Sequence, residues 1–264
     1  MSGNEDDRRP LSGAQEGLWF AHRLAPGTAA YNTGEYVEIH GPIDTAVFER
    51  ALRRTVREAD TFALRFLDTP DGPRAVRDGD PDEVPVHRVD VSGEADPTAA
   101  AEEWIRRDLA TPVDVAAGPL FSHALLTLAP DRFIWFLRAH HILLDGYSYK
   151  LVARRLADTY TALAAGEEPP PAGFESSDRL AAEEAAYLGS DRHRRDRAYW
   201  TERLAGLPEP VRLTDRTAPP RLRSCAVPRS SPPPRRAPWT RPQRGWGSRG
   251  PICWSPPSPP SCTA

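Results

Sequence analysis

Two long apolar runs with a short polar break between them lie in the middle of the chain. Residues 120–128 (LFSHALLTL) and 133–139 (FIWFLRA) are separated only by Ala-Pro-Asp-Arg. Apolar runs of this length joined by turn residues are typical of paired antiparallel strands. The pattern therefore predicts a buried hairpin whose second strand ends where the sequence turns polar, at residue 140.

Local signals predict further helices and strands on both sides of this hairpin. Asp44 is a candidate N-cap for a helix whose buried stripe consists of Val47, Ala51, Leu52 and Val56. The other expected elements are strands at 35–40, 62–67 and 84–91, a turn-rich excursion at 68–82, and helices at 97–110, 148–165, 176–188 and 191–205. Helices mixed with antiparallel strands predict an α/β sandwich.

The composition changes abruptly near residue 216. Up to that point the chain holds 26 basic and all 37 acidic residues, a formal net charge of −11, whereas residues 217–264 contain 8 Arg, 13 Pro and all three cysteines. We therefore expect a flexible N-terminus at 1–10, a folded part at 11–216, and a disordered tail at 217–264. A frameshift near residues 214–222 in a GC-rich coding sequence is our hypothesis for the tail.

Several classes of function are disfavoured by this composition. The acidic folded part argues against a nucleic-acid partner, because phosphate binding needs clustered basic charge. Without cysteine before residue 217, that part has no disulfide scaffold and no thiolate site for zinc. No apolar stretch approaches the roughly 20 residues of a membrane span, and the N-terminus is too polar for a signal peptide. These features predict a soluble cytoplasmic protein without a membrane partner.

The predicted hairpin ends in a group of residues suited to proton chemistry. His140 and His141 are followed by three apolar residues, Asp145 and Gly146. Histidine can take up a proton near neutral pH, and an acid nearby can fix its surroundings. Side chains alternate across a strand, so we expect one histidine to point into packing and the other toward a cavity. The same divergence argues against a metal site formed by this pair, because chelating histidines usually lie at turn or helical spacings.

This motif and three other segments resemble the condensation domains of nonribosomal peptide synthetases. HHILLDG matches the family motif HHxxxDG. Ser12 to Phe20 with Tyr31 and Asn32 is similar to the opening motif SxAQxxLWF…YN, residues 56–66 are similar to RHExLRTxF, and Tyr199-Trp200 is similar to the YW of a late helix. The pattern looks most like condensation domains that open siderophore synthetases of the enterobactin synthase component F type. The resemblance implies a chloramphenicol-acetyltransferase-like sandwich, of which residues 11–216 form the amino-terminal lobe and connecting helices.

The resemblance also implies a role for each histidine. In the family, the second motif histidine faces a tunnel where an acyl thioester meets an amine. His141 is therefore expected to orient or deprotonate the acceptor amine. His140 is expected to support the site from within the fold, and the remaining histidines of the chain are expected to be ordinary.

Asp145 and Gly146 are the other expected supports of the site. Asp145 is expected to hold the loop by pairing with an arginine, and Gly146 to allow close backbone approach before the next helix. The family's usual arginine falls at Ala63 in this sequence, which is a departure from the pattern. Arg65, two residues later on the same predicted strand, is expected to take its place.

The activity implied by the resemblance is amide formation between a carrier-bound acyl or aminoacyl thioester and a carrier-bound amine. The partners would be peptidyl or aryl carrier domains, and 4′-phosphopantetheine would belong to them, so no cofactor is expected on this chain. No carrier domain precedes residue 11, so we expect the donor to come from another polypeptide. Because the family's tunnel lies between two lobes, we expect the isolated chain to be inactive.

Two alternatives remain open at this point. Other acyltransferases that use coenzyme A, including wax-ester-synthase-like enzymes, share HHxxxDG. A pseudogene product or a noncatalytic half-domain that at most binds a partner is the other alternative.

Overall fold

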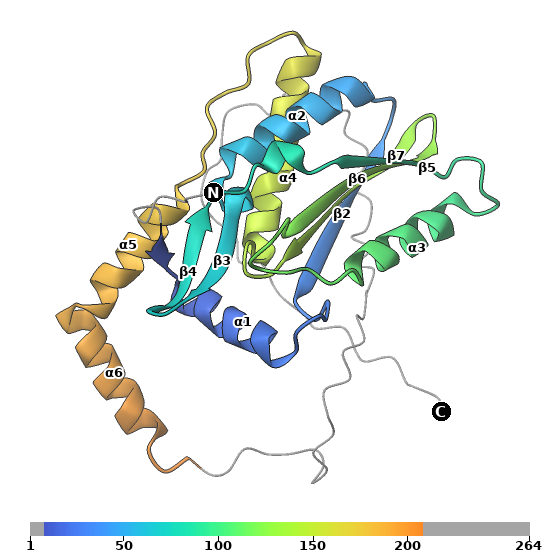
Figure 1. Cartoon of the computed structure of the whole chain (residues 1–264). Helices are drawn as coiled ribbons and strands as arrows, with labels where there is room; N and C mark the ends of the chain where they lie inside the picture. Colours follow the sequence, from blue (N-terminus) through green and yellow to red (C-terminus); the bar gives the residue numbers. More distant parts are fainter. Residues whose placement is uncertain (1–7, 208–264) are drawn as a thin grey trace, which may run out of the picture. The chain divides into compact units, whose positions relative to one another are not determined.

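The computed structural model describes residues 8–207 (Figure 1). The tail predicted at 217–264 and the frameshift proposed near 214–222 lie outside the described residues.

The central element is a four-stranded sheet with the order β2-β7-β6-β5. Its strands are β2 (Asn32–His40), β5 (Val86–Asp90), β6 (Phe121–Ala129) and β7 (Arg132–His140). The predicted hairpin is confirmed, because β6 and β7 pair antiparallel with Ala124 opposite Phe136. β2 pairs antiparallel with the other side of β7, and β5 runs parallel to β6. The motif strand β7 therefore lies between two neighbours.

Helices cover both faces of this sheet (Figure 1). α2 (Thr45–Glu58) and α4 (Gly146–Ala164) pack on one face, where Leu52 joins Leu137 in one buried cluster. α3 (Pro97–Leu109) packs on the other face, where Phe136 belongs to a second cluster. Adjacent residues 136 and 137 thus serve opposite layers, as strand geometry requires. Burying one side chain of this size contributes about 1.5–3 kcal/mol, so the two layers anchor the strand from both sides.

α2 begins as its sequence signals predict. The Asp44 Oδ1 atom accepts hydrogen bonds from the backbone N–H groups of Ala46 and Val47, each at 2.9 Å. The predicted stripe is buried in full: Val47, Ala51, Leu52 and Val56. An N-cap aspartate and an apolar stripe are thus sufficient to place this helix.

A second sheet, with the order β1-β4-β3, corrects one prediction. The excursion at 68–82 contains β4 (Gly72–Arg77), which pairs with β3 (Leu64–Thr69) through a turn at Gly72, where φ is 97°. Because this short strand contains arginines and a proline, its sequence does not show the alternation of polar and apolar residues that predicts a strand. β1 (Arg9–Pro10) pairs with the other side of β4, so these two residues of the expected flexible N-terminus lie in a sheet.

The remaining helices complete the described residues. They are α1 (Gly13–Leu24), α5 (Ser177–Leu188), α6 (Asp191–Leu204) and the short 3₁₀ helices η2 (Asp60–Ala63) and η3 (Pro81–Glu83). Among the described residues, α5 and α6 bury no side chain, and Tyr199 and Trp200 of α6 are more than half exposed. No helix within residues 8–207 is long and apolar enough to cross a membrane.

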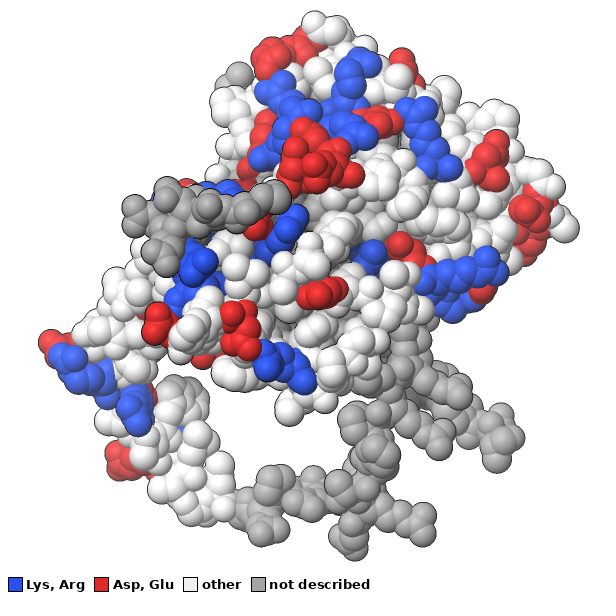
Figure 2. Space-filling model, viewed as in Figure 1, with Lys and Arg blue, Asp and Glu red and all other residues white. Residues whose placement is uncertain are grey.

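Charges of both signs are interspersed on the face of the molecule seen in Figure 2. Separately from this view, Glu49 of α2 accepts hydrogen bonds from Arg88 on β5 and from Arg53 on its own helix. The hydrogen bonds from these arginines lower the pKa of the Glu49 carboxyl, although burial opposes the shift. Arg53 and Arg88 are therefore both paired with one carboxylate.

Candidate active site

The motif forms the turn that joins β7 to α4. Its backbone is held by strands and loops on either side: the His140 N–H donates to Leu120 O and the His141 N–H to Tyr31 O, each at 2.8 Å. Inside the turn, the Leu143 N–H donates to His140 O at 2.9 Å. The two histidines therefore leave the sheet on a rigid backbone.

His140 lies in the protein interior, with 1% of its surface exposed. The Ile142 N–H donates to its Nδ1 atom at 3.2 Å, and its Nε2 atom lies 3.3 Å from Nδ1 of His22. Burial lowers the pKa of His140 to about 4, and the nearby charges of His22, His141 and Arg138 act in the same direction. A ring with this pKa is neutral at neutral pH.

His141, by contrast, is exposed. Its Nδ1 atom lies 2.7 Å from the carbonyl oxygen of Leu144. A carbonyl only accepts hydrogen bonds, so Nδ1 carries the proton of the neutral ring and Nε2 keeps its lone pair. This arrangement fixes the ring and leaves one nitrogen able to accept a hydrogen bond or a proton from a substrate.

The cavity expected beside His141 stays a prediction. A cavity of about 310 Å³ lies elsewhere, between η2, β3 and the segment before β6, and His141 is not among its lining residues. Its walls include Phe62, Leu64, Arg65, Val84, Leu120 and Phe121. His141 opens onto the surface of the chain.

Asp145 is the N-cap of α4. Its Oδ1 atom accepts hydrogen bonds from the N–H of Ser148 at 2.8 Å and from the hydroxyl of Ser148 at 2.6 Å. The hydrogen bond from the Ser148 hydroxyl and, to a smaller extent, the one from its backbone N–H hold the pKa of the Asp145 carboxyl below its ordinary value. The motif aspartate thus fixes where α4 begins and, with it, where the loop of His141 ends.

The prediction of an ion pair between Arg65 and Asp145 is wrong. The Arg65 Nε atom lies 3.4 Å from Asp78 Oδ1, and Asp145 caps α4 instead. Arg65 lies on β3 in the smaller sheet, opposite Val76 of β4, whereas Asp145 follows β7 of the central sheet.

The expected close approach at Gly146 is not found among the described residues either. A Cβ atom built at Gly146 meets nothing within 4 Å, and its φ is not positive. Neither crowding nor backbone strain in the described part of the chain requires glycine here.

A buried ion pair does lie beside the motif, but between residues that the sequence analysis missed. The Arg138 Nε atom donates to Asp108 Oδ2 at 2.7 Å, with 7% and 13% of the two side chains exposed. Ser122 donates from Oγ to Asp108 Oδ1 at 3.1 Å. Arg138 precedes His140 by two residues and shares its face of β7. A single arginine inside an otherwise apolar strand was the signal that could have revealed this pair.

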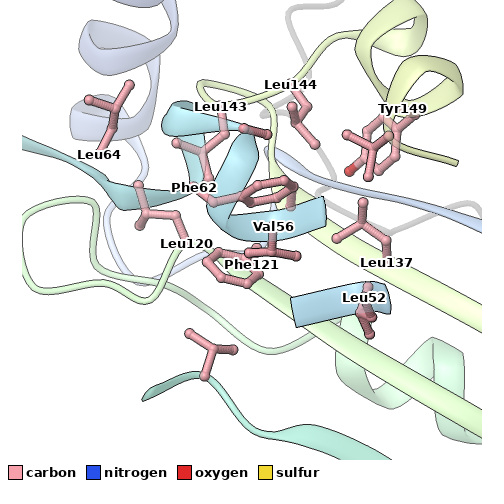
Figure 3. Close-up of a cluster of buried hydrophobic side chains, with 14 of the residues drawn as sticks. Leu52, Val56, Phe62, Leu64, Leu120, Phe121, Leu137, Leu143, Leu144 and Tyr149 are labelled. Carbon is pink, nitrogen blue, oxygen red and sulfur yellow. The ribbon is translucent and has the colours of Figure 1, made fainter. Parts of the chain in front are cut away.

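The apolar spacer of the motif anchors the turn in the core. Figure 3 shows Leu143 and Leu144 among the buried side chains of the cluster that also contains Phe62 and Val56. Thr61 of η2 donates from Oγ1 to Leu143 O at 2.9 Å, so the backbone of the spacer is held as well. Within residues 8–207, no group of three or more His, Cys, Asp or Glu is placed to hold a metal ion.

The family model of the condensation domain matches residues 5–231. This chain belongs to the condensation domain family. The resemblance found in the sequence is therefore confirmed, and the fold is the chloramphenicol-acetyltransferase-like α/β sandwich of nonribosomal peptide synthetase condensation domains.

Curated relatives of this condensation domain chain are nonribosomal peptide synthetases. A dimodular nonribosomal peptide synthase of Bacillus subtilis (strain 168) is 44% identical over 216 residues, which cover 82% of this chain and 9% of the synthase. An isonitrile lipopeptide synthase of Streptomyces coeruleorubidus is 44% identical over 219 residues, 83% of this chain and 15% of the synthase. Enterobactin synthase component F of Escherichia coli O157:H7 is 33% identical over 207 residues, 78% of this chain and 16% of that protein.

Solved structures agree with this assignment. The starter condensation domain of rhizomide synthetase in complex with C8-CoA has a TM-score of 0.77 and 40% identity, over 81% of this chain and 49% of that one. The first condensation domain of the calcium-dependent antibiotic synthetase, in complex with a substrate analogue, has a TM-score of 0.72 and 42% identity, over 79% of this chain and 50% of that one. The chain thus spans about half the length of these solved domains.

Proposed function

We propose that this chain supplies the histidine-bearing lobe of a condensation domain that forms an amide bond. The amine nitrogen of the acceptor attacks the carbonyl carbon of a thioester donor. The new C–N bond forms and the C–S bond breaks, and the proton that the amine loses passes by way of His141 to the departing thiolate, which leaves as the free thiol.

The observation that carries the proposal is the geometry of His141. Its Nδ1 atom lies 2.7 Å from Leu144 O and its ring is exposed, which supports a role in which the Nε2 lone pair accepts a hydrogen bond from the substrate. An acceptor amine hydrogen-bonded to Nε2 would be oriented for attack and could pass its proton to the ring. His140, Arg138 and Asp145 act on the substrate only through the turn that they hold.

In this proposal the donor and the acceptor are both thioesters held by carrier domains. We assign them to peptidyl or aryl carrier domains whose 4′-phosphopantetheine arm bears the acyl or aminoacyl group, and the chain itself holds no cofactor in this scheme. The rhizomide starter domain in complex with C8-CoA supports this assignment, because the acyl group of coenzyme A is also carried on a pantetheine thiol.

The proposed reaction needs more of the domain than this chain provides. The chain covers 49% and 50% of the two solved domains described above. Tyr199 and Trp200 of α6 are 58% and 57% exposed, which leaves apolar surface available to the rest of a domain. A site open to water lacks the preorganised surroundings that acyl transfer requires. We therefore expect the chain alone to be inactive, and a noncatalytic half-domain is the second candidate.

The test is to complete the domain. The chain is joined to the carboxyl-terminal half of the rhizomide starter domain and supplied with octanoyl-CoA and leucyl-N-acetylcysteamine. Mass spectrometry should detect the octanoyl-leucyl amide with the completed domain and not with the chain alone.

Three results would contradict the proposal. A completed, folded domain that binds octanoyl-CoA without forming amide would favour the noncatalytic candidate. Preferential acylation of a long-chain alcohol would favour the wax-ester-synthase-like alternative. Equal turnover by the chain alone would refute the need for a second lobe.

A further inference from the structure

His22 lies outside the motif, in the last turn of α1, yet its imidazole contacts the buried motif histidine. Nδ1 of His22 lies 3.3 Å from Nε2 of His140, and the ring centroids are 5.1 Å apart in an edge-to-face arrangement. His22 is itself buried, with 8% of its surface exposed. Buried polar atoms are normally hydrogen-bonded, so this contact completes the bonding of the His140 ring.

The direction of the hydrogen bond follows from the other nitrogen of His140. Its Nδ1 atom receives the N–H of Ile142, so Nδ1 bears a lone pair and not a proton. A neutral imidazole carries one N–H, which must then be on Nε2. That proton faces Nδ1 of His22, so His22 is the acceptor and carries its own proton on Nε2. Burial lowers the pKa of both imidazoles, which agrees with two neutral rings.

The same N-terminal segment holds the motif at two further points. Gln15 of α1 donates from Nε2 to Ile142 O at 3.3 Å, and Tyr31 O accepts from the His141 N–H at 2.8 Å. Three consecutive motif residues are thus held by α1 and the loop that follows it. α1 is fixed at its start by a capping box between Ser12 and Gln15, so His22 projects from an anchored helix.

We propose that His22 is a positioning residue for the condensation reaction. By accepting the Nε2 proton of His140, it holds that ring in one tautomer and one orientation, and thereby sets the turn from which His141 projects. This inference rests on the proposed function of His141. His22 does not touch substrate in this scheme and acts only through His140.

The test compares two variants of the full chain by NMR of ¹⁵N-labelled histidine. Long-range ¹⁵N–¹H spectra of the unsubstituted protein should show the His140 and His22 protons on Nε2. His22→Leu removes the acceptor, so the slowly exchanging Nε2–H of His140 should be lost and the ring signals of His141 should shift or broaden. His22→Asn offers Oδ1 as an acceptor and should restore both signals.

A matched control is His87→Leu. His87 packs against Trp104 with ring centroids 5.6 Å apart, away from the motif, so its loss should leave the His141 signals unchanged. A His140 proton on Nδ1 in the unsubstituted protein would overturn the proposal. Unchanged His141 signals in folded His22→Leu, or failure of His22→Asn to restore them, would overturn it too. If His22→Leu does not fold, the tautomers and the His22→Asn variant decide the question.

Activity of the completed domain separates this inference from the proposed function. There, His22→Leu should lower kcat by about 10- to 100-fold, with KM within about twofold, and His22→Asn should recover most of the loss. The NMR result needs no substrate. Absence of amide product with intact tautomers would therefore count against the proposed function alone, whereas full turnover by His22→Leu would count against the positioning role alone.

Discussion

Replacing Arg138 by methionine should destabilise the fold far more than the same change at Arg65. Both arginines pair with an aspartate, but their surroundings differ. The Arg138–Asp108 pair is a 2.7 Å contact with 7% and 13% of the side chains exposed. The Arg65–Asp78 pair is a 3.4 Å contact with 33% and 50% exposed.

The expected magnitudes follow from this burial. Removing one partner of a buried pair leaves the other charge buried and unpaired, which lowers the free energy of unfolding by about 3–5 kcal/mol. The Nη1 atom of Arg138 is buried without a hydrogen-bond partner among the described residues, so the substitution also relieves one unfavourable group. We therefore expect a loss near the lower end, about 3 kcal/mol. An exposed pair contributes about 0–1 kcal/mol, so Arg65→Met should lose no more than that.

Urea unfolding at pH 7, followed by far-ultraviolet circular dichroism, measures both changes. The free energy of unfolding should fall by about 3 kcal/mol for Arg138→Met and by less than about 1 kcal/mol for Arg65→Met. The double variant Arg138→Met with Asp108→Asn should recover part of the loss, because it removes the unpaired charge of Asp108. Equal losses for the two single variants, or a loss below about 1 kcal/mol for Arg138→Met, would refute the argument from burial.

Three other predictions concern the helix start, a buried histidine and a second ion pair. Asp145→Ala should lower the free energy of unfolding by about 1 kcal/mol, because it removes the cap of α4. The pKa of this carboxyl is lowered in the fold, so its contribution should be present at pH 7 and lost as the pH falls below about 3.9. Urea unfolding midpoints of both proteins at pH 7 and pH 3 would show this. Burial lowers the pKa of His123 to about 3, so this ring alone should remove about 1.4 kcal/mol of stability per pH unit as the pH drops below about 6.5, and His123→Phe should reduce the measured slope between pH 6 and 4 by that amount, leaving the slope due to His140. Arg155→Met should lower the unfolding free energy by about 3–5 kcal/mol, because it breaks the hydrogen bonds of 2.6 and 2.7 Å to Glu58 between α4 and α2; a loss below about 1 kcal/mol would contradict this expectation.

The elements that the sequence predicts correctly are those with local signals. α2 has an aspartate cap and an apolar stripe, and the β6–β7 hairpin consists of two apolar runs with a turn between them. The missed strand β1 depends on pairing with residues 74–75, which are far away in the chain, whereas the missed strand β4 pairs with the neighbouring strand β3. Short strands rich in arginine and proline carry little periodicity, so their pairing is decided by tertiary structure.

The same division applies to the site. Alternation along β7 predicts that His140 and His141 differ, and one is buried while the other is exposed. The partner of His140 is 118 residues away, and no local pattern distinguishes His22 from other histidines. Likewise, the distance between Arg65 and the motif depends on which sheet β3 joins. Contacts of this kind are set by topology, which residue spacing alone does not reveal.

The most direct test of the account is the effect of His141→Ala on amide formation by the completed domain. The matched control is His193→Ala, because Nδ1 of His193 also lies near a backbone carbonyl, that of Leu188 at 3.0 Å, but outside the motif. His141→Ala should lower the rate of octanoyl-leucyl amide formation by about 100-fold or more while the unfolding midpoint is unchanged, and His193→Ala should retain the unsubstituted rate. A His141→Ala domain that forms amide at the unsubstituted rate would contradict the central claim.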